Sequence, residues 1–170
     1  MSDVHRIRDE LSAILDVVKT SGGPSDISSA ESIATKALLL SAASHFEREI
    51  CTTILECAQG GGARPIYVAF IERQGLDRRY HAMFSWEHSN LNKFFSLFGD
   101  VAKLKLSAAA KEEDISSSIG DFIYLGSKRN ELVHQNFAGF SLDVTFDDVW
   151  RKYESANVVP SWIKAKLTEL

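Results

Sequence analysis

The sequence contains few cysteines, which can cross-link a fold, and few prolines, which interrupt helices and strands: there are two cysteines and three prolines among 170 residues. Cys51 and Cys57 are too few for a disulfide framework, and their spacing does not match that of paired metal-binding or redox cysteines. We therefore expect both thiols to be reduced and to lie in the core, which is typical of a cytoplasmic protein.

Long apolar runs are also absent from the sequence. No run approaches the roughly 20 apolar residues that a membrane-spanning helix needs. The first residues, MSDVHRIRDEL, are charged rather than apolar, unlike a secretory signal peptide. These two absences predict a cytoplasmic protein without a membrane partner.

The sequence also lacks an excess of positive charge. The chain has 19 basic and 23 acidic residues, for a net charge of −4 at pH 7. A protein that coats long nucleic acid by bulk attraction needs a strongly basic face. Any contact with nucleic acid must therefore be local.

What is present is a helical hydrophobic period, and no alternating strand pattern or internal repeat accompanies it. The 45% hydrophobic content is enough for one buried core in one domain, 1–170. The pattern predicts an all-α helical bundle with a long central helix over 31–59 and a second long helix over 115–134. Ser28 with Glu31, and Thr145 with Asp148, have the spacing of N-terminal capping boxes. Shorter helices are expected elsewhere, including one over 78–87, and the acidic "KEED" is expected to open the second long helix.

The stretch "SKRNELVHQNF", 127–137, carries residues suited to phosphate chemistry. Asn130 and His134 are four apart and share a helix face, and Arg129 is long enough to reach the same place. Guanidinium groups match phosphate oxygens in a bidentate way, and imidazole can exchange protons near neutral pH. Metal-free RNA cleavage needs such a cation and such proton carriers. An arginine and a histidine in the last turns of a helix also interact favourably with the helix dipole. The spacing alone therefore leaves a purely structural role open.

The segment "RNELVH" resembles the Arg-polar-x3-His signature of HEPN domains, in which it lies near the end of a long helix in a helical bundle. Together with "LLLSAASHFEREI" and "NLNKFFSLFGD", the resemblance is to the RiboL-PSP subgroup and covers roughly Ala30 to Phe137. The first helix and the C-terminal helical extension, about 139–170, lie outside it. The resemblance implies a metal-independent endoribonuclease of the toxin–antitoxin or phage-defence kind, usually a homodimer whose two motif helices face each other across a cleft.

The resemblance also implies roles for individual residues. Arg129 would bind and neutralise the scissile phosphate, His134 would be a general acid or base, and Asn130 would orient one of them. Glu47, in "SHFEREI", would support the site by contacting Arg129 or fixing the histidine tautomer, or else it is an ordinary surface charge. His45 is a second supporting candidate, although a polar residue on a helix face fits it better.

Three basic residues outside the motif trio are candidates for contact with RNA. Arg78 and Arg79 are followed by aromatic residues in "RRYHAMFSW", a mixture that single-stranded RNA binding uses, and Lys128 adjoins the motif. The alternative is that the rings belong to the core and the arginines to a solvated face. His81 and His88 have no Cys or acidic partner at zinc-ligand spacing, so no metal site and no cofactor are expected.

Three hypotheses remain open from the sequence. The favoured one is a ribonuclease acting on single-stranded RNA or tRNA loops, held in check by an antitoxin or regulatory protein. The others are a catalytically silent HEPN-like binding module and a helical adaptor or antitoxin without chemistry. Because one motif helix carries one histidine while transesterification wants an acid and a base, we also expect a homodimer, with Leu132 and Phe137 in its interface.

Overall fold

The computed structural model describes residues 2–135 and 137–170, and within them every regular element is a helix. This confirms the predicted all-α class. Within the same residues, no helix combines the length and apolar character needed to cross a membrane. In chain order the elements are α1 (Asp3–Ser21), α2 (Pro24–Gly60), α3 (Pro65–Phe70), the π-helix η1 (Ile71–Leu76), the 3-10 helix η2 (Tyr80–Met83), α4 (Asn92–Ser96), α5 (Asp100–Glu112), α6 (Ser116–His134), α7 (Phe146–Ala156) and α8 (Val159–Thr168).

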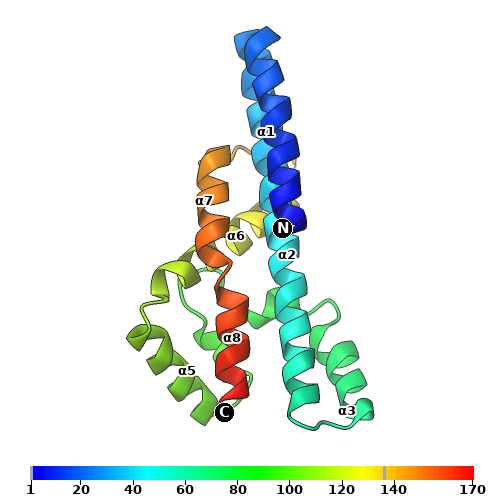
Figure 1. Ribbon diagram of the computed structural model, residues 1–170, viewed down its shortest axis with the longest axis vertical. Helices are drawn as coiled ribbons and strands as arrows, with labels where there is room; N and C mark the ends of the chain where they lie inside the picture. Colours follow the sequence, from blue (N-terminus) through cyan, green and yellow to red (C-terminus); the bar gives the residue numbers. More distant parts are fainter. Residues whose placement is uncertain (1, 136) are drawn as a thin grey trace.

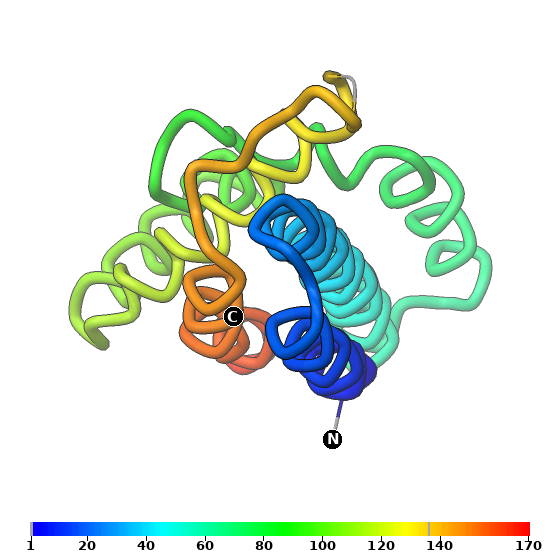
Figure 2. The backbone as a smooth tube through the Cα atoms, turned by 90° about the horizontal axis from the view of Figure 1, so that it is seen from above, coloured from blue at the N-terminus to red at the C-terminus, as the bar shows by residue number. Residues whose placement is uncertain are grey.

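Helix α2 is the axis of the molecule. It forms a long antiparallel hairpin with α1, whose far end projects beyond the other helices (Figure 1). Seen from above, α3 lies on one side of α2, while α7 and α8 lie on the other (Figure 2). Phe46 of α2 contacts the rings of Phe122 in α6 and Tyr153 in α7, with ring centroids 5.3 and 5.4 Å apart. The core therefore joins α2 to the motif helix and to the C-terminal helices.

Several predicted helix boundaries are confirmed because they depend on local chemistry. The Thr145 hydroxyl accepts a hydrogen bond from the Asp148 amide at 3.1 Å, and the Asp148 carboxylate accepts from the Thr145 amide at 3.2 Å, which is the predicted capping box. The long central helix ends at Gly60. Pro65 and Pro160 stand in the first turns of α3 and α8, where a missing amide proton costs nothing.

Three boundary predictions are wrong. Helix α2 begins at Pro24, before the predicted Ser28–Glu31 box, because Asp26 already accepts a hydrogen bond from the Gly23 amide at 3.1 Å and caps the helix there. The "KEED" segment closes α5 instead of opening α6, which starts at Ser116. The expected helix over 78–87 is reduced to the single turn of η2, followed by irregular chain.

Candidate functional site

The motif residues occupy the last turns of α6, where they remain accessible to solvent. Arg129 and Asn130 are half-buried, and His134, the last residue of the helix, is exposed. Arg129 Nη1 donates a hydrogen bond to Asn130 Oδ1 at 3.3 Å. The amide therefore restrains the guanidinium, while the arginine keeps most of its five donors for other partners.

An indole packs on the same helix one turn earlier. Gly126, Asn130 and His134 follow one another at four-residue steps and so lie along one face of α6. A Cβ atom at Gly126 would overlap the ring of Trp86, so glycine is what allows Trp86 to lie against the helix. The Trp86 ring stacks on Phe122, and its Nε1 donates to the His81 carbonyl oxygen at 2.8 Å. The segment that contains η2 is thereby fixed beside the motif helix.

His81 is the residue that this packing brings to the site. Its Nε2 lies 3.8 Å from Glu47 Oε2 of α2, and both side chains are more than a third exposed. Its Nδ1 is buried and has no hydrogen-bond partner among the described residues. Burial lowers the pKa of His81 below its ordinary 6.5; the positive charge of Arg129 and a smaller effect of His134 act in the same direction, and Glu47 opposes them. Glu47, His81, Arg129 and His134 thus share one electrostatic neighbourhood.

Of the two supporting residues expected from α2, the structure brings one to this neighbourhood. Glu47 faces His81, and its charge also raises the pKa of the buried Tyr80 hydroxyl, for which burial is the larger cause. His45 lies two residues earlier and therefore on a different side of the helix, with its ring 5.7 Å from that of Tyr153 and its Nδ1 3.4 Å from Arg48 Nη2. His45 does not join Arg129 and His134.

The residues expected to contact RNA are placed differently from one another. Arg78 lines a groove of about 570 Å³ beside Glu47, Cys51 and Arg73, and Arg79 is exposed next to it. Lys128 instead forms ion pairs with Glu131 at 3.2 Å and Asp143 at 3.3 Å. Its charge is already balanced by two carboxylates, so it is poorly placed to attract a phosphate.

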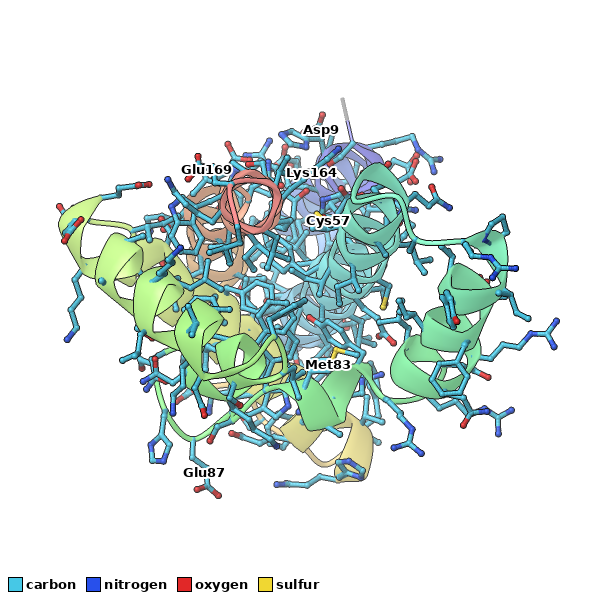
Figure 3. All side chains as sticks on the ribbon, turned by 90° about the horizontal axis from the view of Figure 1, so that it is seen from below. Asp9, Cys57, Met83, Glu87, Lys164 and Glu169 are labelled. Carbon is cyan, nitrogen blue, oxygen red and sulfur yellow. The ribbon has the colours of Figure 1, made fainter. Side chains whose placement is uncertain are left out.

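The aromatic residues after Arg79 are largely core. Tyr80 and Phe84 are buried, and Trp86 is partly buried against Phe122. The alternative that assigned these rings to the core therefore describes them better than base stacking does. In the side-chain view, Met83 points into the molecule while Glu87 points outward, so this segment is anchored on one side only (Figure 3).

A buried lysine holds the chain just after the motif helix. Lys36 of α2 is 4% exposed, and its Nζ donates to the Phe137 carbonyl oxygen at 2.8 Å and lies 5.0 Å from the centroid of the Phe137 ring. Sequence reasoning missed Lys36, and it weighed His81 only as a possible metal ligand. No local pattern marks either, because their partners lie far away in the chain.

The prediction that Leu132 lies in a dimer interface is wrong. It is 1% exposed and packs in the core, so it cannot contribute to contact with a second copy. Val133 and Phe137 are 51% and 45% exposed, and these are the apolar side chains beside His134 that another chain could reach. The error arose because Leu132 and Val133 are adjacent in sequence but point to different sides of α6.

No group of three or more His, Cys, Asp or Glu side chains suited to a metal ion occurs in the part of the chain that the structure describes.

An all-α bundle with an accessible Arg-Asn-x3-His set at the end of a long helix defines a HEPN-type domain. The profile of the family described as RiboL-PSP-HEPN matches residues 2–163, so the chain belongs to that family. The match includes α1 and α7, which lie outside the stretch Ala30 to Phe137 on which the sequence resemblance rests. Searches of curated proteins and of solved structures find no match.

Proposed function

We propose that this protein is a metal-independent endoribonuclease that cleaves RNA by attack of a 2′-OH on the adjacent phosphate. The observation that supports it is the accessible set at the end of α6, in which Arg129 is restrained by Asn130 and His134 faces solvent. Arg129 neutralises the charge that develops on the phosphate, and His134 transfers a proton. Membership of a HEPN family supports the same reading, since these domains are often ribonucleases.

The test is incubation of the purified protein with total RNA in EDTA, followed by analysis of the new ends. Attack by the 2′-OH leaves a 2′,3′-cyclic phosphate and a 5′-OH, and DNA lacks the nucleophile. We expect these ends, no cleavage of DNA, and no effect of EDTA. A requirement for magnesium would contradict the metal-independent mechanism. RNA left intact while the protein binds it would favour the catalytically silent binding module instead.

We further propose that the protein acts as a homodimer whose contact includes the exposed Val133 and Phe137 beside His134. Light scattering at micromolar concentration should give twice the monomer mass, and V133D with F137D should give the monomer. A monomeric wild type whose activity is unchanged on dilution would contradict the dimer.

The biological setting we propose is a toxin or phage-defence nuclease restrained by an antitoxin or regulatory protein. Expression of the active chain alone should then arrest growth, and expression of Arg129→Ala should not. Equal growth of cells that produce the two proteins at the same level would contradict this setting.

A further inference from the structure

The segment 64–79, which contains α3 and η1, lies to one side of α2 and carries exposed rings together with exposed arginines (Figure 2). Building on the proposed nuclease function, we propose that this segment, the α3 arm, binds unpaired nucleotides of the RNA substrate next to the phosphate that is cut. Tyr67 and Phe70 stack on the bases, and Arg64 and Arg73 bind the phosphates between them.

Three apolar side chains project into solvent from one side of α3. Ile66, Tyr67 and Phe70 are 67%, 58% and 64% exposed, whereas Val68 is buried. Tyr67 and Phe70 are three residues apart, so on a helix they are neighbours on the same face. Val68 lies on the opposite side, which is therefore the side that packs against the molecule. Two neighbouring rings thus face solvent, unlike the rings after Arg79 that belong to the core.

The α3 arm also has a local excess of positive charge. Arg64, Arg73, Arg78 and Arg79 are all exposed, and none of their guanidinium groups forms an ion pair within residues 2–135 and 137–170. Four arginines against two carboxylates give the arm a net charge of +2, whereas the whole chain has −4. Guanidinium groups without a partner in the chain can pair with phosphate oxygens. The arm is thus the kind of local basic surface that an acidic protein needs for contact with RNA.

The α3 arm leads toward the motif helix. Arg78 and Arg79 lie in the chain between η1 and η2, and the segment that contains η2 is held against α6 where Trp86 packs on Gly126. Arg129 follows Gly126 by three residues and so lies within the next turn of α6. A strand bound on the arm can therefore continue past Arg78 and Arg79 to a phosphate held by Arg129.

The groove between the α3 arm and α2 does not suit the phosphates. It has a volume of about 570 Å³, and the carboxylates of Glu47, Glu72 and Asp77 line it together with Arg73 and Arg78. Three carboxylates against two arginines repel a phosphate on balance. The strand therefore lies across the outer side of the arm, where the rings and the arginines are exposed.

The size of this surface favours unpaired RNA over a protein partner. A stable protein interface buries about 800 Å² on each side, which three apolar side chains on a six-residue helix do not supply. Aromatic rings that stack on bases, with cations along the phosphates, are instead the usual means of binding single-stranded nucleic acid. Bases stacked in a duplex hide their faces from such rings. The substrate class is therefore RNA that is unpaired beside the cut.

Binding of an RNA that cannot be cut tests the α3 arm separately from the chemistry. The probe is a single strand of about 12 nucleotides with 2′-O-methyl groups, which keeps bases and phosphates but lacks the 2′-OH nucleophile. Tyr67→Ala and Phe70→Ala should each weaken its binding about 5- to 100-fold, measured by fluorescence anisotropy. The matched control is Val101→Ala with Leu104→Ala, two side chains three residues apart that are 68% and 73% exposed on α5, and it should bind like the wild type.

Salt dependence separates the phosphate contacts from stacking. Each phosphate contact to a single strand contributes about 0.7 to the slope of log K against log salt, so Arg64→Gln with Arg73→Gln should reduce that slope by about 1.4. The ring variants should leave the slope unchanged. Lys103→Gln with Lys105→Gln removes the same charge from exposed positions of α5, on the opposite side of the molecule from α3, and should keep the wild-type slope (Figure 1).

The melting temperatures of all these variants should match that of the wild type, because every side chain changed is exposed. Failure of the wild type to bind the probe, wild-type binding by the ring variants, or an equal loss in the α5 controls would overturn the assignment. So would a dimer that dissociates in Tyr67→Ala with Phe70→Ala while RNA affinity stays the same, since the face would then be a contact between copies.

The two proposals fail in different ways. If the wild type binds the probe through the α3 arm but leaves unmodified RNA intact, the arm stands and the nuclease function is wrong. If the ring variants bind the probe and cut unmodified RNA like the wild type, the nuclease function stands and the arm is wrong.

Discussion

Arg129 and His134 are both accessible to solvent, and Asn130 restrains Arg129, which is the arrangement expected of residues that serve a substrate and not the core. Replacing His134 by Ala removes a proton carrier, and replacing Arg129 by Ala removes the cation, so each change should lower cleavage about 100- to 10,000-fold. Since neither side chain is buried, each should cost no more than about 1 kcal/mol of unfolding free energy. Melting temperatures and cleavage rates measured on the same preparations test this.

Arg129→Lys refines the same prediction. Lysine keeps the charge but loses the planar fork, so most activity should disappear if the phosphate is held in a bidentate way. Asn130→Ala should have a milder effect, because it removes only the 3.3 Å restraint on the guanidinium. Cleavage that merely tracks the folded fraction across these variants would contradict a chemical role for the motif.

The backbone of Arg78 has a conformation that glycine and asparagine adopt more readily than arginine does. Its φ of 58° is left-handed, a region in which asparagine and glycine are comfortable and arginine is strained, yet this arginine lines the groove beside Glu47. Arg78→Asn should therefore keep or slightly raise the melting temperature while weakening RNA binding. Lys105→Ala, on the exposed face of α5, removes one positive charge elsewhere and is the control. Equal loss of affinity in both variants would mean that net charge alone matters.

At the scale of elements, two glycines of α6 offer a matched pair. A Cβ at Gly120 would meet only the Ser89 side chain at 4.0 Å, so Gly120→Ala should stabilise the helix by up to about 1 kcal/mol. A Cβ at Gly126 would overlap Trp86 and displace it, so Gly126→Ala should cost about 1–3 kcal/mol. Denaturant unfolding of the two variants should therefore give changes of opposite sign.

The same pair tests the link between η2 and the motif helix. Displacing Trp86 disturbs the packing on α6 one turn before Asn130, so Gly126→Ala should also lose cleavage activity at temperatures where it is fully folded. Gly120→Ala should cut RNA at the wild-type rate. Full activity in a folded Gly126→Ala would show that the position of the indole does not matter to the chemistry.

For the whole molecule, two partly buried histidines couple stability to pH. Burial is the largest cause that lowers the pKa of both His45 and His81 below 6.5. The unfolded chain then binds protons more readily than the folded one, so unfolding free energy falls as pH drops from about 6.5 through the lowered values. His45→Gln, away from the motif, should reduce this fall without altering cleavage. Chemical denaturation at about pH 7.5 and pH 5.5 measures it, and an equal fall in both proteins would contradict it.

The sequence by itself determined what depends on neighbours along the chain. The helical period, the Thr145–Asp148 box and the prolines at 65 and 160 act within one turn, and all are confirmed. The motif at 129–134 could also be read directly, because residues four apart must share a helix face.

Only the tertiary structure decided how the site is completed. Glu47 and His81 lie close together because Trp86 packs on Gly126 of α6. Leu132 is buried, and so unavailable to an interface, because it lies on the side of α6 that faces the core. The segment at 78–87 is mostly not helical, because its aromatic rings pack in the core and its backbone carbonyl oxygens accept hydrogen bonds from the side chains of Trp86 and Lys93. Burial and contacts between distant segments have no local signal, since the free energy that fixes them arises only when the helices pack together.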